Sequence, residues 1–133
     1  MNKIKLLALD LDDTLLRSDL TISYRTRNAI KRTEAAGVTV VLASARVSST
    51  LEHFSNLLGM HKLKGYIISN NGALVQESTT GNIIHEARIP SDIALIVCDL
   101  ASSEGFSVQL YEDDIMYVSR KNEYTAYDQK LTG

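Results

Sequence analysis

Residues 4–16 read IKLLALDLDDTLL, an apolar run that ends in a cluster of carboxylates. Residues 4–9 are almost continuously apolar and too short for a helix, which predicts a buried strand of a parallel sheet. Asp10, Asp12 and Asp13 follow this strand directly. Carboxylates this close together repel one another unless a cation or a reacting group lies among them. A turn capped by Asp12 or Asp13 is the plainer alternative, but the whole string favours a reaction site at the end of the strand.

The next sixty residues alternate between helical and strand patterns. Residues 24–36 carry apolar side chains at helical spacing, with Ser23 as the expected N-cap, and residues 38–43 form a second buried strand. Residues 47–58 again show one apolar helix face, and residues 66–69 read as a third strand. Strand–helix–strand–helix–strand is the pattern of right-handed βαβ units, so the sequence predicts an α/β fold with an open parallel sheet.

The pattern changes after residue 72. Residues 73–75 and 83–84 flank a polar stretch and predict a hairpin, and residues 91–104 predict a helix. Two alternating segments, 106–110 and 115–118, then predict an antiparallel pair joined by a turn at Asp113-Asp114. We therefore expect an α/β part at residues 1–85 and an α+β part at residues 86–133.

Composition narrows the class of protein further. The chain has 133 residues, of which 44% are hydrophobic and 23% charged, and a net charge of −2, so no basic surplus points to nucleic acid or to an anionic membrane. The single cysteine, Cys98, excludes an internal disulfide, and the sequence shows no readable signal peptide or membrane span. These features favour a cytoplasmic protein with neither a nucleic-acid nor a membrane partner.

Polar residues also follow the second and third predicted strands. Ser44, Ala45 and Arg46 stand between the second strand and the next helix, where free N–H groups at a helix start suit a phosphate. Taken alone, such a serine is more often an N-cap. Asn71-Gly72 follows the third strand and by itself indicates only a turn. Because ligands of parallel sheets bind at the carboxyl ends of the strands, these positions are candidates for one site.

Together these motifs resemble the haloacid dehalogenase-like superfamily, and its Cof-type phosphatases in particular. Asp10, Asp12 and Thr14 match the Asp-x-Asp-x-Thr string that the family carries after its first strand. Residues 44–46 match its second motif, with Ser for the usual Thr and Ala for Gly, and residues 71–73 match the Asn-Gly-Ala of the Cof-type group. The segment 91–119 is similar to the opening of the family's α+β cap domain.

The resemblance implies a Mg²⁺-dependent phosphatase of small phosphorylated metabolites. It implies that Asp10 is the nucleophile that forms an aspartyl-phosphate and that Asp12 is the general acid and base. Mg²⁺ would be held by the Asp10 side chain and the Asp12 backbone carbonyl, and the phosphoryl group would be bound by Ser44 with its neighbours Ala45 and Arg46.

The chain departs from the family in its second half. None of its glycines is followed by Asp, so the late Gly-Asp motif that completes the metal site is missing, as is the lysine motif. We therefore expect an N-terminal fragment with an incomplete site, which leaves strand 4–9 as an open edge and favours a homo-oligomer. A sugar phosphomutase would use the same residues. A receiver-like phosphoacceptor domain would need an Asp after the third strand, where Ser69-Asn70-Asn71 stands. A fragment that binds a ligand but has no catalytic activity is the remaining alternative.

Overall fold

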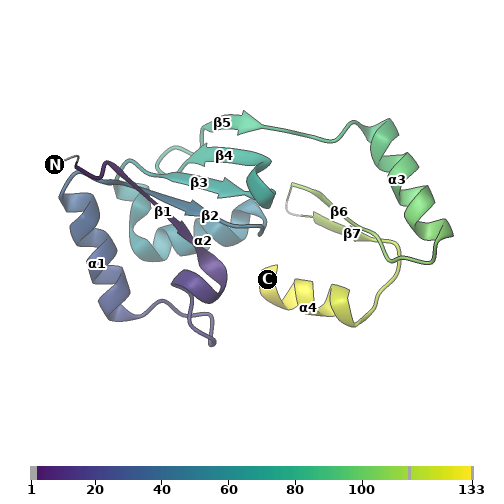
Figure 1. Cartoon of the computed structure of the whole chain (residues 1–133), viewed down its shortest axis with the longest axis horizontal. Helices are drawn as coiled ribbons and strands as arrows, with labels where there is room; N and C mark the ends of the chain where they lie inside the picture. Colours follow the sequence, from purple (N-terminus) through teal and green to yellow (C-terminus); the bar gives the residue numbers. More distant parts are fainter. Residues whose placement is uncertain (1–2, 114, 133) are drawn as a thin grey trace. The chain divides into compact units, whose positions relative to one another are not determined.

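The computed structural model describes residues 3–113 and 115–132, and the chain divides into two compact units, Met1–Glu86 and Ala87–Gly133. The unit Met1–Glu86 is built on a five-stranded sheet. Its strands, in spatial and in chain order, are β1 (Leu6–Asp10), β2 (Thr39–Ala43), β3 (Tyr66–Ser69), β4 (Leu74–Glu77) and β5 (Ile83–Glu86). The first three are parallel and the last two return as antiparallel hairpin strands (Figure 1). The predicted α/β class with a parallel-rich sheet is confirmed.

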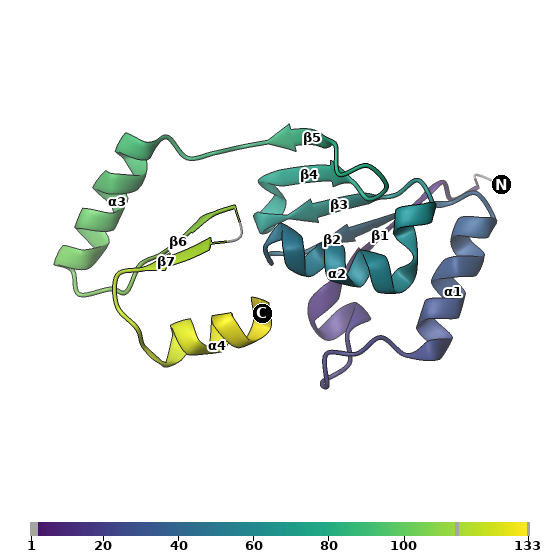
Figure 2. The same cartoon turned by 180° about the vertical axis from the view of Figure 1, so that it is seen from behind.

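Both helices of this unit lie on one face of the sheet. Helix α1 (Tyr24–Ala35) connects β1 to β2, and α2 (Ser48–Leu58) connects β2 to β3. Successive right-handed crossovers that step in the same direction place their helices on the same side, and the views from front and back show this arrangement (Figures 1 and 2). The side chains between sheet and helices form one buried apolar cluster: Leu11, Leu15, Leu16, Ile22, Ile30, Val40, Leu42, Leu51, Phe54, Leu58, Met60 and Ile67.

Local sequence sets the helix ends close to their predicted positions. The Ser23 side chain accepts a hydrogen bond from the Thr26 N–H at 3.0 Å, which satisfies one of the free donors at the start of α1. Helix α2 ends at Gly59, whose φ of 85° lies in the left-handed region that glycine adopts without strain. These two caps mark where α1 begins and where α2 ends.

The prediction that residues 4–9 form a buried strand is wrong on burial, although the strand and its parallel pairing with β2 are confirmed. β1 is the last strand of the sheet order, and the Leu6 side chain is 53% exposed. Its free edge meets no further strand in the described residues, so an apolar sequence typical of a sheet centre stands at a sheet margin.

The unit Ala87–Gly133 holds helix α3 (Ser91–Ser103), a two-stranded antiparallel ribbon of β6 (Gln109–Glu112) and β7 (Ile115–Val118), and helix α4 (Glu123–Thr132). The helix and ribbon were predicted, whereas α4 was not, because its weakly amphipathic sequence gives no clear apolar face. Asp114 of the predicted turn lies outside the described residues. Thr125 is the one buried side chain among those described in this unit, which leaves it without an apolar core.

Helix α1 carries one partly buried carboxylate, that of Glu34. Both Glu34 side-chain oxygens are shielded from solvent and accept no hydrogen bond within the described residues. Burial raises the pKa of Glu34 above its usual value of 4.5, and the nearby Lys31 opposes this only in part. An acid whose folded pKa is raised stabilises the fold at low pH, and that contribution is lost as the pH rises through the folded value.

Replacing Glu34 by Gln should therefore raise the melting temperature at pH 7, because a neutral amide avoids the cost of burying an unpaired carboxylate. The difference from wild type should shrink as the pH falls below 4.5, because Glu34 then becomes protonated in both the folded and the unfolded chain. Thermal unfolding followed by circular dichroism over this pH range measures it. The exposed Glu104→Gln serves as the matched control and should leave the melting temperature unchanged. Equal melting temperatures for wild type and Glu34→Gln at every pH would contradict this account.

Candidate active site

The parallel strands bring the predicted site residues to one edge of the sheet. Asp10 is the last residue of β1 and pairs with Ala43 of β2, which in turn pairs with Ile68 of β3. The loops that follow these strands, including the one that begins at Ser44, therefore start at the same end of the sheet. This is the carboxyl edge at which parallel sheets bind their ligands.

A short irregular turn, Leu11–Leu15, presents the acidic residues beyond β1. Leu11 is fully buried and accepts a 2.8 Å hydrogen bond from the Leu16 N–H, which closes the turn. Asp12 is extended in its backbone, and Asp13 adopts a positive φ of 55°, a conformation that aspartate tolerates better than most residues. The leucines anchor the turn in the core, while the carboxylates of Asp10, Asp12 and Asp13 remain accessible.

Arg46 joins this turn to the loop after β2. Its Nε donates to Asp12 Oδ2 at 3.0 Å and its Nη2 to Asp12 Oδ1 at 2.5 Å, so the guanidinium binds both carboxylate oxygens. The Arg46 side chain is only 7% exposed and that of Asp12 is 50% exposed. A two-point pairing of this kind fixes the direction of the carboxylate as well as its position.

The loop Ser44–Arg46 is also tied to β3. The Ser44 N–H donates to the Ile68 carbonyl and the Asn70 N–H donates to the Arg46 carbonyl, both at 2.9 Å. The Arg46 N–H donates to the Ser44 hydroxyl at 3.3 Å. The Ser44 and Arg46 amides already donate hydrogen bonds to these partners. The Ala45 amide and the Ser44 hydroxyl are therefore the groups of this loop that can donate hydrogen bonds to an anion.

Two polar features near this edge gave no signal in the sequence. Ser69, the last residue of β3, is fully buried, and its hydroxyl has no hydrogen-bond partner in the described chain. In addition, the buried Gln76 of β4 accepts from the Ser48 hydroxyl and donates to Glu52, both at 2.7 Å. This second network fastens the first turn of α2 to β4. The network joins side chains from different elements, so the spacing of residues along the sequence could not predict it.

The donor set at the edge fits a hard cation only in part. Carboxylate oxygens are the ligands that Mg²⁺ prefers, and Mg²⁺ commonly takes one or two of them and keeps several waters. Asp10 and the turn that follows it offer such oxygens. Among the described residues, however, no three His, Cys, Asp or Glu side chains come together as a metal site. The chain can supply part of a Mg²⁺ site, and further oxygen ligands would have to come from water or from other polypeptide.

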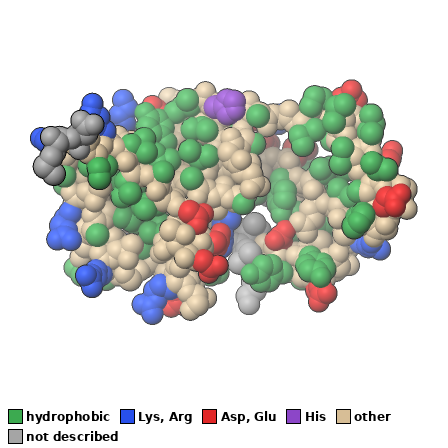
Figure 3. All heavy atoms as spheres, viewed as in Figure 1, with side chains coloured by type: hydrophobic (Ala, Val, Ile, Leu, Met, Phe, Trp, Pro, Cys, Tyr) green, Lys and Arg blue, Asp and Glu red, His purple; other side chains and the backbone are tan. Residues whose placement is uncertain are grey.

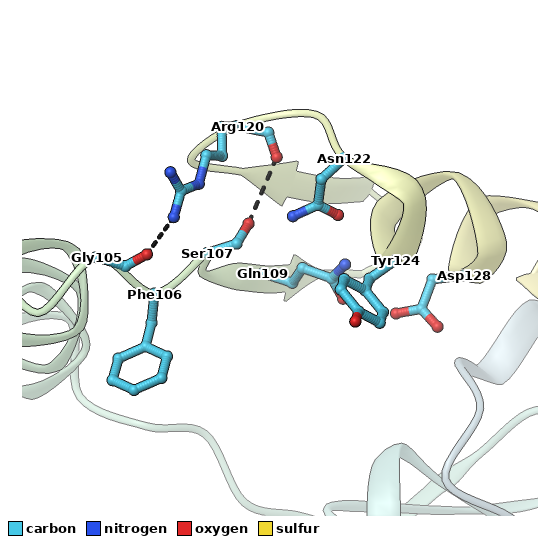
Figure 4. Close-up of a pocket in the computed structure, with 8 residues that line it drawn as sticks. All are labelled: Gly105, Phe106, Ser107, Gln109, Arg120, Asn122, Tyr124 and Asp128. Atoms are coloured by element: carbon cyan, nitrogen blue, oxygen red, sulfur yellow. Dashed lines mark hydrogen bonds between the residues drawn. The ribbon is translucent and has the colours of Figure 1, made fainter.

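A separate pocket lies within the second unit, between the start of β6 and α4 (Figure 4). The Arg120 guanidinium on its rim donates to the Gly105 carbonyl, and the Ser107 hydroxyl donates to the Arg120 carbonyl at 3.5 Å. Asn122 and Asp128 also line the pocket. None of the residues predicted for the phosphate chemistry lines this pocket.

Comparison with known proteins identifies the family. A family model described as haloacid dehalogenase-like hydrolase matches residues 7–132. The chain belongs to the haloacid dehalogenase-like hydrolases. It is 27% identical over 130 residues to a putative phosphatase, YxeH, of Bacillus subtilis, a match that covers 96% of this chain and 48% of that protein. It is 28% identical over 118 residues to an HMP-PP phosphatase of Escherichia coli, covering 89% of this chain and 42% of the relative.

Solved structures agree with this assignment. A haloacid dehalogenase-like hydrolase from Bacteroides thetaiotaomicron superposes with a TM-score of 0.86 at 28% identity, over 97% of this chain and 49% of that one. A haloacid dehalogenase-like hydrolase from B. subtilis gives a TM-score of 0.78 at 26% identity. The chain thus spans about half the length of the relatives that it matches. Within residues 3–113 and 115–132, no helix combines the length and the apolar character needed to cross a membrane.

The Arg46–Asp12 pair should be energetically coupled. Arg46→Ala and Asp12→Ala, alone and combined, should give a double-mutant coupling of about 1 kcal/mol or more in urea unfolding, because either single change leaves the other group without its two-point partner. The exposed pair Arg17 and Asp19, 4.0 Å apart, provides the control, and its coupling should be near zero. Additive effects at Arg46 and Asp12 would show that the pairing contributes nothing to the fold.

Proposed function

We propose that this chain carries the nucleophile half of the active site of a Mg²⁺-dependent phosphatase that acts on small phosphorylated metabolites. The observation that carries the proposal is the meeting of Asp10, the Asp12-containing turn and the Ser44 loop at the carboxyl edge of three parallel strands. Membership in a hydrolase family whose relatives include named phosphatases supports it. The same proposal treats residues 1–85 as the core and residues 86–133 as part of an α+β cap, in a cytoplasmic protein.

Asp10 is the proposed nucleophile. One of its carboxylate oxygens would attack the phosphorus, the bond from phosphorus to the leaving oxygen would break, and the phosphoryl group would remain on Asp10 as an acyl phosphate. Water would then attack that phosphorus and release inorganic phosphate. The exposed position of Asp10 at the strand end suits this role, because a substrate can approach it from solvent.

Asp12 is the proposed general acid and base. It would give a proton to the leaving oxygen in the first step and take one from the attacking water in the second. Each of its oxygens accepts one hydrogen bond from Arg46 and keeps a second lone pair, with which the carboxyl group can hold the proton that it transfers. Arg46 would therefore act on catalysis through Asp12, while the Ser44 hydroxyl and the Ala45 amide would bind the phosphoryl oxygens. A bound Mg²⁺ would supply positive charge to those oxygens.

The role of Asp10 can be tested in a version of the protein extended to the length of its relatives. Asp10→Asn should abolish turnover of an aryl phosphate, because an amide cannot form the acyl phosphate. Asp12→Asn should slow turnover by roughly two to four orders of magnitude, the usual loss for a general acid and base. Asp99→Asn, on the exposed part of α3, is the control and should retain the wild-type rate. An undiminished rate in Asp10→Asn would refute the assignment of the nucleophile.

The 133-residue chain itself should bind Mg²⁺ weakly and show little or no phosphatase turnover. It offers the carboxylates of Asp10 and the adjoining turn but no cluster of three acidic or histidine ligands in its described residues. Isothermal titration with Mg²⁺ and a phosphate-release assay on the purified chain measure both properties. Rapid turnover by this chain alone would mean that the remaining catalytic groups lie within it.

A further inference from the structure

A hollow of about 420 Å³ lies between α1, α2 and the loop that leads into α1. Its apolar lining comes from Leu20 and Ile22 of the loop and from Phe54 and Leu57 of α2. None of its described lining residues belongs to the sheet or to the second unit, and none is a residue proposed for the phosphate chemistry. Its volume lies in the range of pockets that hold small organic molecules.

Arg27 of α1 brings an unpaired cation to this hollow. Its Nε is shielded from solvent and donates no hydrogen bond within the described chain, and its guanidinium takes part in none of the ion pairs found there. The one acid on the same helix, Glu34, lies seven positions away and is not its partner. A shielded N–H without an acceptor costs free energy, which a bound anion would recover.

The charges around Arg27 also favour an anion. Lys and Arg side chains lie along the side of the unit that α1 occupies (Figure 3). Among the described residues that line the hollow none is acidic, and His53 of α2 offers a further ring nitrogen. Asp19, in the adjoining loop, already accepts two hydrogen bonds from Thr21. Four of the five charged residues on α1 are basic: Arg25, Arg27, Lys31 and Arg32.

Leu20 lines the hollow from a strained backbone conformation. Its φ of 60° lies in the left-handed region, which a bulky side chain rarely adopts. Two hydrogen bonds of 2.9 Å close the loop around it, from the Leu20 N–H to the Arg17 carbonyl and from the Arg17 N–H to the Thr21 carbonyl. Glycine would form this turn without strain, so the turn alone does not account for a leucine. Strained residues of this kind cluster at sites that hold ligands.

We propose that the hollow between α1 and α2 binds a small organic carboxylate with an apolar body. The carboxylate pairs with the Arg27 guanidinium, and the body packs against Leu20, Phe54 and Leu57. Arg27 is the one permanently charged side chain among the described lining residues, so it balances a single negative charge, whereas a phosphate dianion would remain partly uncompensated. The site is separate from the Ser44 loop and does not depend on phosphatase activity.

Titration of the ¹⁵N-labelled 133-residue chain with 3-phenylpropanoate, followed by NMR, tests the proposal. The acid should give saturable shifts at the backbone amides of Arg27, His53 and Leu57. The neutral 3-phenylpropanamide has the same apolar body without the charge, and it should bind about tenfold more weakly or worse. This comparison uses the wild-type chain alone.

Two arginines of α1 provide a matched pair of variants. Arg27→Gln should weaken binding of the acid about tenfold or more, because it removes the charge that faces the carboxylate. Arg25→Gln makes the same change at an exposed arginine outside the hollow and should leave the affinity unchanged.

Leu20→Asn separates binding from folding. Asparagine tolerates a positive φ better than leucine, so the melting temperature should stay the same or rise, while binding of the acid weakens because an apolar contact is lost. A lower melting temperature with unchanged binding would show that Leu20 serves the fold and would remove it from the site.

Three results would overturn the proposal. They are equal affinities for the acid and the amide, shifts centred on the Ser44 loop in place of the hollow, and no saturable shift up to roughly 20 mM acid. The first and third need no variant, so the proposal can be refuted even if Arg27→Gln fails to fold. Failure of the Asp10 assignment would leave it unaffected, because no turnover is measured.

Discussion

The parallel register of β1, β2 and β3 is the constraint on which the rest of the structure depends. It aligns Asp10, Ala43 and Ile68 in one row, and so the three following loops begin at one level. It also forces both crossover helices onto the same face, where they bury a single apolar cluster. The position of the site and the single layer of helices both follow from this one arrangement.

Arg46 then connects the loops that the strands bring together. Its guanidinium holds Asp12 from the first loop, and its carbonyl receives the Asn70 N–H from the third. A buried arginine with a carboxylate partner is costly to disturb, so the relative positions of these loops are well determined before any ligand binds. The network of Ser48, Gln76 and Glu52 adds a second tie between α2 and the sheet.

Much of this could be predicted from the sequence, because strands and helices here follow local rules. Apolar runs, the Ser23 cap and the left-handed Gly59 place the core elements to within a residue or two. The burial of β1 was mispredicted because its composition is that of a central strand, whereas burial depends on neighbours that a sequence does not display. Helix α4 was missed because its apolar residues form no clear stripe. Arg46 and Asp12 form an ion pair although they lie 34 positions apart in the sequence, so no local pattern could predict their contact.

The central claim is that Asp10 accepts the phosphoryl group, and it can be tested by locating that group chemically. A version of the protein extended to the length of its relatives would be mixed with an aryl phosphate, quenched in acid and treated with borohydride, which reduces an aspartyl-phosphate to homoserine. Peptide mass spectrometry would then locate the modified residue. The account predicts homoserine at position 10 and an unmodified Asp12. Phosphate on Ser44, or homoserine at another aspartate, would contradict it.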